Sequence, residues 1–586
     1  MVRTAPPFCV FPPPSERRRE KQRRRSEAVL PPLRLPPGVF QPEGSDGGEG
    51  WGGGLAVAWL WGLCLLGVSI ALMSCSVAPA PVEHPSSGLE TLWVVDPERL
   101  SPAEQTLVVT LQGLVAGGAA DGAPRTATAI WIQDPGMNAL ILDDLVAEGV
   151  ATQNAESVWD LLSQFRDDVA GMVLYEQQTD SINVATSLCG PLQAVAVDGS
   201  LQPQAEAAGL EVLADVRGMD EVEAFAEYGA LFTPAAGTDA KPALLIEQAE
   251  SKAAHLRDFA VARRAFTVYG LGRDDHTRVA TALGRDLTVY GWGGDEHAWI
   301  RQVSSEGGAG IPADWSRNLS VLQRLPATLP ERPRPTVRPV RTGERIVAFV
   351  MSDGDNIQWM GGQFATSEGF WASPHRGTFN MTWEMAPSLA EVAPRVLAHF
   401  YQTASRGRAI DDFIAGPSGL GYAFHNYLPD REAFAVRTAK AMQASNLVIT
   451  TMLNSGGGMD QSAELLAQPE VMGVIYKDYS PYNAKEGRIF WHEGKPCVSY
   501  RYLLWDPLPK NSPEGVAAAI AGLPASPKTD PNSYALINVH AWSYEAIGGP
   551  MEAVARTIEL LPPKTRVVTA EELIVLLREN FGEPVK

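Results

Sequence analysis

Short apolar runs alternate with helical patterns along most of the chain after residue 88. In the C-terminal half, eight such runs predict strands at residues 346–351, 378–383, 413–415, 447–452, 471–476, 497–502, 535–540 and 566–569. Continuous apolar runs of this length are typical of parallel strands that are buried on both faces. Eight strand–helix units in about 240 residues match a TIM-type (β/α) barrel in number and length. Because the first unit has little helical pattern, we expect a distorted or incomplete barrel.

The preceding part, residues 89–324, contains shorter β-rich runs that also alternate with helical patterns. They predict strands at residues 91–95, 127–132, 171–175, 194–197, 211–213, 266–269 and 287–290. This alternation indicates α/β layers with a mostly parallel sheet. Five prolines within residues 325–345 predict an extended linker. The expected fold class is therefore α/β, with an N-terminal α/β layered region followed by a C-terminal barrel at residues 346–586.

The first 88 residues have the features of a targeting segment. Residues 1–54 are rich in Pro, Arg and Gly and are expected to be disordered. Residues 55–75 are almost wholly apolar and end in Ser-Cys, which resembles the lipobox of bacterial lipoproteins, with Cys75 as the lipidated residue. An uncleaved membrane helix is the alternative, since about 20 apolar residues span a bilayer. Residues 76–88 would be a tether, and the globular part is expected outside the cytoplasm as a membrane-anchored lipoprotein.

Composition narrows the classes of partner. The formal net charge is -20, which argues against nucleic acid, because phosphate binding needs clustered Lys and Arg. The five cysteines form no CxxC motif and no Cys/His cluster. No GxGxxG motif or P-loop in residues 89–586 would place a nucleotide. We therefore expect no metal and no cofactor.

Polar and aromatic residues gather directly after the predicted strands of the C-terminal half. The loops that follow barrel strands meet at one face, so these residues are expected to form one site. The catalytic candidates are Asp353, Asp355 and Glu384. The substrate-binding candidates are Asn356, Trp383, Gly419, Gly421, Tyr422, Lys477, Tyr479, Arg501, Trp505, His540 and Trp542.

Asp353 and Asp355 are separated by Gly354 alone. In an extended segment both side chains point to the same side, and two close carboxylates repel, so one keeps a proton at neutral pH. Glycoside hydrolysis needs one carboxylic acid and one carboxylate. An Asx turn and a cation site are the alternatives for this segment.

The other candidates suit a sugar site, but each also has a structural alternative. Lys477 and Arg501 could orient the carboxylates, bind an acidic sugar or form buried ion pairs. Trp505 and Trp542 could stack on sugar rings or belong to the core. His540 could be catalytic or a hydrogen-bonded core residue.

Two longer segments resemble the GxGYxYP family, whose expected activity is glycoside hydrolysis. They are FVMSDGDNIQW at residues 349–359 and AGPSGLGY at residues 415–422, with further agreement at residues 290–296, 314–320, 494–496 and 536–542. The Gly-x-Gly-Tyr part of the motif is intact, whereas Phe424 and His425 stand where Tyr and Pro are expected. Loss of that tyrosine hydroxyl removes one possible hydrogen bond to a ligand.

The resemblance and the carboxylate pattern together imply a glycoside hydrolase that acts on extracytoplasmic carbohydrate. Two alternatives use the same residues. One is a non-catalytic glycan-binding surface lipoprotein. The other is a metal-dependent carbohydrate hydrolase or deacetylase with Asp353, Asp355 and His540 as ligands.

Overall fold

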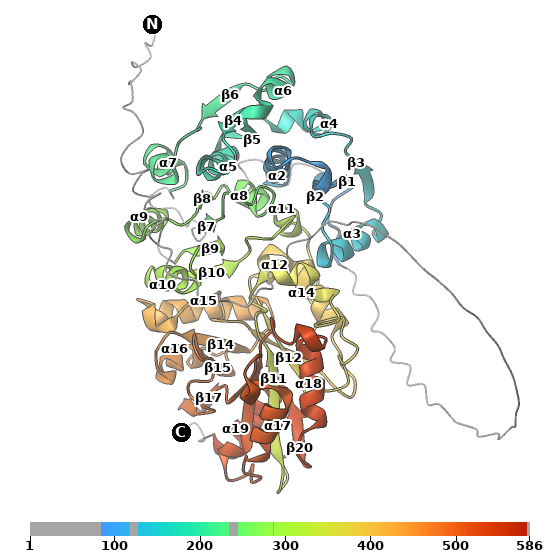
Figure 1. Cartoon of the computed structure of the whole chain (residues 1–586), viewed down its shortest axis with the longest axis vertical. Coiled ribbons are helices and arrows are strands. Elements are labelled where there is room, and N and C mark those ends of the chain that lie inside the picture. Colours follow the sequence, from blue (N-terminus) through green and yellow to red (C-terminus); the bar gives the residue numbers. More distant parts are fainter. Residues whose placement is uncertain (1–83, 118–126, 234–243, 285, 583–586) are drawn as a thin grey trace, which may run out of the picture. The chain divides into compact units, whose positions relative to one another are not determined.

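The computed structural model describes residues 84–117, 127–233, 244–284 and 286–582 (Figure 1). These residues belong to one compact unit that spans Cys75–Lys586. The predicted disordered extension, the signal segment and Cys75 lie outside the described residues. No helix in the described ranges is long and apolar enough to cross a membrane.

The N-terminal region contains three parallel sheets. The first, in the order β2-β1-β3, consists of β1 (Thr91–Val95), β2 (Thr128–Ile132) and β3 (Ala151–Asn154). The second, in the order β5-β4-β6, consists of β4 (Gly171–Tyr175), β5 (Ala194–Asp198) and β6 (Val212–Asp215). The third, in the order β10-β9-β7-β8, consists of β7 (Leu244–Glu247), β8 (Phe266–Val268), β9 (Thr288–Gly291) and β10 (Ala309–Pro312). The predicted mixed α/β class is therefore confirmed, with three separate sheets.

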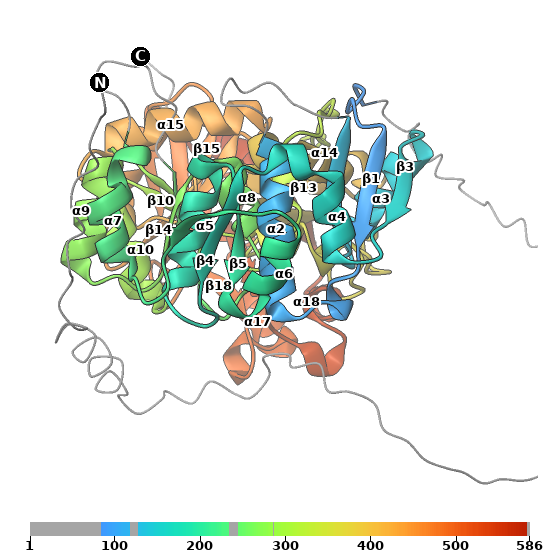
Figure 2. The same cartoon turned by 90° about the horizontal axis from the view of Figure 1, so that it is seen from above.

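Helices follow most of these strands. They are α2 (Pro102–Gly117), α3 (Met137–Ala147), α4 (Val158–Gln164), α5 (Ser181–Leu192), α6 (Gln202–Ala207), α7 (Glu221–Tyr228), α8 (Arg257–Ala262), α9 (Arg273–Leu283), α10 (Glu296–Ser305) and α11 (Leu319–Leu322). Helix α2 is mostly buried and packs against α8, β5 and β2 (Figure 2). It therefore joins the first sheet to the second through one apolar core.

The C-terminal region is built on one large sheet. Its strands are β11 (Arg345–Met351), β12 (Met381–Met385), β13 (Asp411–Ala415), β14 (Ile449–Asn454), β15 (Gly473–Asp478), β16 (Ile489–His492), β17 (Lys495–Ser499), β18 (Tyr502–Leu504), β19 (Tyr534–Val539) and β20 (Thr565–Val568). The order is β16-β17-β15-β14-β13-β12-β11-β19-β18, and β20 also pairs with β11. All pairs are parallel except β16 with β17. Helices α12 (Ile357–Met360), α13 (Leu389–Val392), α14 (Pro394–Thr403), α15 (Arg431–Ala444), α16 (Ala463–Leu466), α17 (Pro513–Ala521), α18 (Pro550–Glu559) and α19 (Ala570–Phe581) accompany it.

The two ends of this strand order are close in sequence. The predicted strand at 497–502 is divided into β17 and β18, and only Tyr500 and Arg501 separate them. Because so short a connection joins the β17 side to the β18 side, the sheet must curl back on itself. Among the described strands, however, no ladder pairs β17 with β18. The sheet is a curled, incomplete barrel, and the closed TIM-type ladder is not confirmed.

The proline-rich segment before β11 packs against the C-terminal sheet. Arg332 is 2% exposed. Its guanidinium donates to the Asn446 carbonyl oxygen at 2.8 Å and pairs with Asp412 at 3.1 Å and Glu571 at 2.5 Å. This extended segment is therefore part of the C-terminal fold, and Glu571 has a structural role.

Replacing Arg332 with leucine is expected to lower the free energy of unfolding by about 3 to 5 kcal/mol, because Asp412 would become a buried charge without its partner. Urea unfolding monitored by fluorescence measures the change. Arg334 is the matched control, since it also pairs with Glu571, at 3.6 Å, but its side chain is 57% exposed. Arg334→Leu should lower the free energy of unfolding by less than about 1 kcal/mol. Equal losses of stability in the Arg332 and Arg334 variants would contradict the structural role of the buried Arg332 ion pairs.

Candidate active site

The turn after β11 lies directly against β12. Asp353 has a left-handed backbone with a φ of 69°, and its N–H donates to Glu384 Oε2 at 3.1 Å. A Cβ at Gly354 would lie 1.6 Å from the Glu384 carbonyl oxygen, so only glycine allows this approach. The Asp-Gly-Asp sequence therefore places both aspartates beside the end of β12.

Glu384 is held by the protein on both of its carboxylate oxygens. Oε2 accepts from the Asp353 N–H, and Oε1 accepts from the Thr451 hydroxyl at 2.7 Å. The residue is 1% exposed, and burial raises the pKa of Glu384. Glu384, a catalytic candidate from the sequence, therefore fixes the turn after β11, and its charge acts on Asp355.

Asp355 is the buried carboxyl group of the turn after β11. It is 9% exposed. Burial raises the pKa of Asp355 well above its usual value, the charge of Glu384 raises it further, and Lys477 opposes the shift. Asp353 is only half-buried. Two carboxyl groups two residues apart thus have unlike environments, as acid/base chemistry requires.

A buried cation balances these carboxylates. Lys477 in β15 is 2% exposed, and its Nζ lies 4.3 Å from the centre of the Tyr482 ring. Burial alone would lower the pKa of Lys477, but the charges of Glu384 and Asp353 raise it above its usual value. Lys477 therefore stays charged at neutral pH. Tyr482, which was not predicted, adds a buried phenol beside it.

Stacked rings form one wall of the site. His540 follows β19, and its ring lies parallel to Trp505 with centroids 3.8 Å apart and 7° between the planes. Tyr482 packs against Trp505 at 5.0 Å. The His540 Nδ1 is 3.0 Å from the Ser543 hydroxyl, and burial lowers the pKa of His540. A neutral imidazole and an indole thus present flat surfaces next to the charged groups.

Residues that follow strand β9 of the third N-terminal sheet supply a second wall. Helix α10 begins at Glu296, whose Oε1 accepts from the Tyr422 hydroxyl at 2.8 Å. Trp292 lies nearly parallel to the Tyr422 ring, with centroids 6.3 Å apart. Burial raises the pKa of Glu296, and the charge of Asp353 raises it further. The sequence signal for Glu296 is the segment YGWGGDE at residues 290–296, which agrees with the family and could either shape a wall of the pocket or be structural.

The Gly-x-Gly-Tyr motif positions Tyr422 in this wall. Gly419 has a φ of 86°, and a Cβ there would lie 2.3 Å from Thr438 Cγ2 on α15. The Tyr422 backbone exchanges two hydrogen bonds with Gly310 in β10, at 2.7 and 3.0 Å. A Cβ at Gly421 would lie 2.9 Å from the Gly310 carbonyl oxygen. Both glycines, predicted as ligand contacts, therefore pack the turn against its neighbours.

The two residues that replace Tyr-Pro in the motif are buried. Phe424 is fully buried and packs against His297 at 5.2 Å and Tyr479 at 5.5 Å. His425 is 1% exposed and lies against Phe434 at 5.3 Å. This departure from the motif therefore changes the packing behind Tyr479, which is itself half-buried.

Two predicted residues lie elsewhere. Trp383 is 1% exposed, and its Nε1 donates to Asp411 Oδ1 at 3.0 Å. It faces the core because neighbouring residues of a strand point to opposite sides, and Glu384 faces the site. Arg501 donates to the Asn532 carbonyl oxygen at 3.3 Å, near the start of β19, whereas His540 follows the end of that strand.

Two others lie at the edge of the site. The Asn356 N–H donates to the Asp353 carbonyl oxygen at 3.2 Å, which closes the catalytic turn. Trp542 follows His540 after β19 and is 55% exposed, with its ring 4.7 Å from Trp359. An exposed indole beside the strand ends is suited to stacking on a ligand.

The sequence matches three parts of one family. Residues 344–578 match the "GxGYxYP putative glycoside hydrolase C-terminal domain", residues 169–230 the second N-terminal domain and residues 242–324 the third domain. These matches include the strand-end carboxylates as well as Glu296. The chain belongs to the GxGYxYP family.

One solved structure is similar over most of both chains. It is described as the crystal structure of a putative hydrolase from Bacteroides thetaiotaomicron, with 25% sequence identity and a TM-score of 0.73. The similarity covers 85% of this chain and 96% of that one. No curated protein matches the sequence. The family and this neighbour support a hydrolase.

Proposed function

We propose that this GxGYxYP protein is a glycoside hydrolase in which Asp355 donates the proton to the leaving group. The observation that carries the proposal is the unlike environment of Asp353 and Asp355 beside Lys477. Asp355 gives its proton to the glycosidic oxygen as the bond to the anomeric carbon breaks. The Asp353 carboxylate faces the positive charge that develops at that carbon, and a water oxygen then bonds to the carbon while the water proton passes to the Asp355 carboxylate. The charge of Lys477 favours ionised carboxylates beside it, and it therefore limits how far burial and Glu384 raise the pKa of Asp355.

Carbohydrate is the substrate class that suits the walls of the site. Sugar rings present apolar faces to aromatic side chains and hydroxyl groups to polar ones. Trp505, His540 and Trp542 offer such faces, and Tyr422 and Glu296 offer hydrogen-bonding groups. In this proposal the curled sheet acts as a distorted relative of a TIM-type barrel, whose strand ends supply the chemistry.

Reducing-sugar release by residues 76–586 across a broad panel of glycans tests the proposal. We expect release from at least one glycan, and its loss in folded Asp353→Asn and Asp355→Asn variants. Binding of a glycan without release by the unmodified chain would instead favour a glycan-binding protein. The exposed Trp542 is the observation that favours that second function.

The metal-dependent alternative requires Asp353, Asp355 and His540 to converge on one cation. Within the described ranges, side chains close enough to share a cation are found at Asp180, Glu221 and Glu250 instead, in the N-terminal region. The geometry therefore gives this alternative no support.

Replacing Glu296 with glutamine is expected to lower kcat/KM by about five- to tenfold, because the amide keeps the shape of the group and removes its charge beside Asp353. Initial rates on the cleaved glycan measure the effect. Glu306 at the other end of α10 is the control, since its Oε1 lies 3.2 Å from the His276 ring and away from the site residues. If Glu296→Gln has the same kcat/KM as the unmodified enzyme, Glu296 does not contribute to catalysis.

We further propose that the enzyme acts outside the cytoplasm on a lipid anchor at Cys75. The support is the apolar segment that ends in Ser-Cys, followed by a Pro- and Ala-rich tether. In a bacterial host, Cys75→Ser is expected to abolish labelling by radioactive palmitate. Labelling that persists would mean that the anchor is elsewhere.

A further inference from the structure

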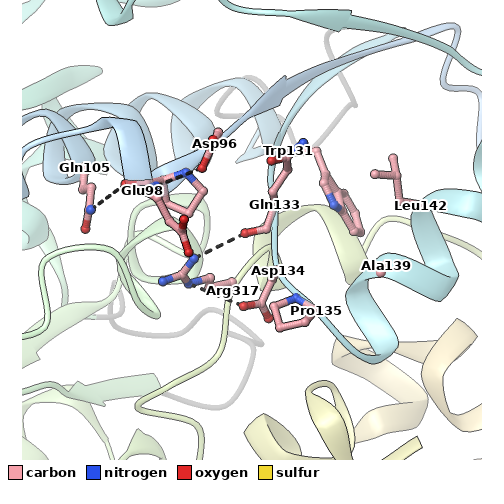
Figure 3. A pocket seen from close by; sticks show the side chains of 11 residues that line it. Asp96, Glu98, Gln105, Trp131, Gln133, Asp134, Pro135, Ala139, Leu142 and Arg317 are labelled. Atoms are coloured by element: carbon pink, nitrogen blue, oxygen red, sulfur yellow. Dashed lines mark hydrogen bonds and ion pairs between the residues drawn. The ribbon is translucent and has the colours of Figure 1, made fainter. Parts of the chain in front are cut away.

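A cavity lies at the edge of the first N-terminal sheet, and none of the candidate active-site residues lines it. Its volume is about 640 Å³, within the range of small-molecule sites. Strands β1 and β2 are parallel neighbours that end at Val95 and Ile132. The residues that follow them, Asp96 and Gln133, line the cavity (Figure 3). Ligands of open α/β sheets bind in the crevice outside the carboxyl ends of the strands, which is where this cavity lies.

A third segment, distant in sequence, completes the cavity. Arg317 follows β10 and donates to the Gln133 carbonyl oxygen at 3.3 Å, and its Nε lies 3.9 Å from Asp134 Oδ1 (Figure 3). The His255 ring, at 3.2 Å from the same Nε, fixes the guanidinium from behind. A donor-only and an acceptor-only group are therefore held side by side at the wall.

The floor of the cavity contains an unsatisfied donor. Trp131 is fully buried, and its Nε1 has no hydrogen-bond partner among the described residues. A buried N–H without an acceptor destabilises the fold, and a ligand oxygen that accepts from it would remove that cost. Leu142 and Ala139 of α3 supply apolar surface beside the indole.

We infer that this cavity binds an uncharged carbohydrate chain. The three carboxylates of Asp96, Glu98 and Asp134 outnumber the single cation of Arg317, which disfavours phosphate and acidic sugars. A sugar hydroxyl both donates and accepts, so neighbouring hydroxyls match the Asp134–Arg317 pair. Binding of a neutral glycan at this cavity does not depend on the proposed function. Only the statement that this glycan is also the substrate rests on the proposed function.

Side chains connect the cavity with the turn after β11. A smaller adjoining cavity shares Asp134 and Arg317 and reaches Trp315 and Gln358. Trp315 is 58% exposed, and its N–H donates to Gln358 Oε1 at 2.6 Å. Gln358 lies two residues after Asn356, which closes the catalytic turn. This adjoining cavity is only about 20 Å³, too small for a sugar ring, so the exposed Trp315 is the surface that a longer glycan would meet beyond the cavity.

Ala139→Trp tests the inference, because this exposed helix residue lines the cavity and the new ring would fill it. Ala147→Trp is the matched control, since Ala147 is exposed on the same helix outside the cavity lining. Both are made in residues 76–586 that carry Asp355→Asn, so that no substrate is consumed. The probes are soluble starch, galactomannan, xyloglucan and arabinan in native affinity gels, with alginate as the acidic comparison.

We expect at least one neutral polysaccharide to retard the parent and the Ala147→Trp protein equally, and Ala139→Trp to weaken that binding at least tenfold. Equal retardation of the two tryptophan variants, preference for alginate, or no retardation of the parent by any neutral polysaccharide would overturn the inference. The readout is independent of hydrolysis. The two proposals can therefore fail separately. If the unmodified protein releases no sugar but the parent binds glycan through this cavity, the proposed enzyme is refuted and the binding site is supported.

Discussion

Replacing Asp355 with asparagine is expected to lower kcat/KM by about 10²- to 10⁴-fold, the contribution of a positioned general acid. The amide has no acidic proton to give to the leaving group, while the turn that holds it is fixed by Gly354 and Glu384. Initial rates on the glycan that the unmodified enzyme cleaves, at its own pH optimum, measure the effect.

Stability measurements separate chemistry from misfolding. A carboxyl group whose folded pKa is raised stabilises the fold below its unfolded pKa, and this stability is lost as pH rises through the folded value. Asp355→Asn cannot ionise, so its Tm at alkaline pH should equal or exceed that of the unmodified enzyme. Asp478→Asn is the control, because Asp478 ends β15 next to Lys477 but accepts from the Tyr476 hydroxyl. An equal loss of activity in the control would contradict the assignment.

Replacing Glu384 with glutamine is expected to move the alkaline limb of the pH–rate profile to lower pH. The general acid must be protonated, so activity falls as pH rises through the raised pKa of Asp355. The charge of Glu384 is one cause of that raised pKa, and its removal lowers the pKa of Asp355. Each unit of movement reduces the rate on this limb about tenfold. The measurement is kcat/KM against pH.

Thr451→Ala is the control for Glu384→Gln. It removes the hydrogen bond to Glu384 Oε1 and keeps the carboxylate charge. We expect the alkaline limb to stay close to its original position in this variant. An unmoved limb in Glu384→Gln would mean that the charge of Glu384 does not control the acid.

Burial explains many of the strands that could be predicted. The strands that were predicted in the C-terminal sheet are apolar runs, and residues such as those of β11 are almost all buried. Strand β3 was not predicted because its sequence, ATQN, is polar and fully exposed. Strand β10 was missed because it contains Gly and Pro within four residues, which are disfavoured in strands. Burial does not explain every strand, since β7 was missed although its sequence, LLIE, is apolar and mostly buried, and β6 was predicted although it is mostly exposed.

The candidate site could be predicted only where strand ends define it. Asp353, Asp355 and Lys477 follow or end parallel strands, so sequence order alone brings them to one edge. The position of Trp383 was wrong because its neighbour Glu384 takes the side that faces the site. Glu296 could not be found in this way, since its contact with Tyr422 depends on how one region packs against another.

The leaving group of the substrate tests the role of Asp355 most directly. Aryl glycosides with an acidic phenol need little protonation to depart, whereas natural glycosides need a full proton transfer. The comparison is kcat/KM of Asp355→Asn and the unmodified enzyme on a dinitrophenyl glycoside and on the natural glycan that carries the same sugar. We predict a loss of about 10²-fold or more on the natural glycan and a loss of less than about tenfold on the activated one. Equal losses on both substrates would contradict the account, because Asp355 would then not be the proton donor.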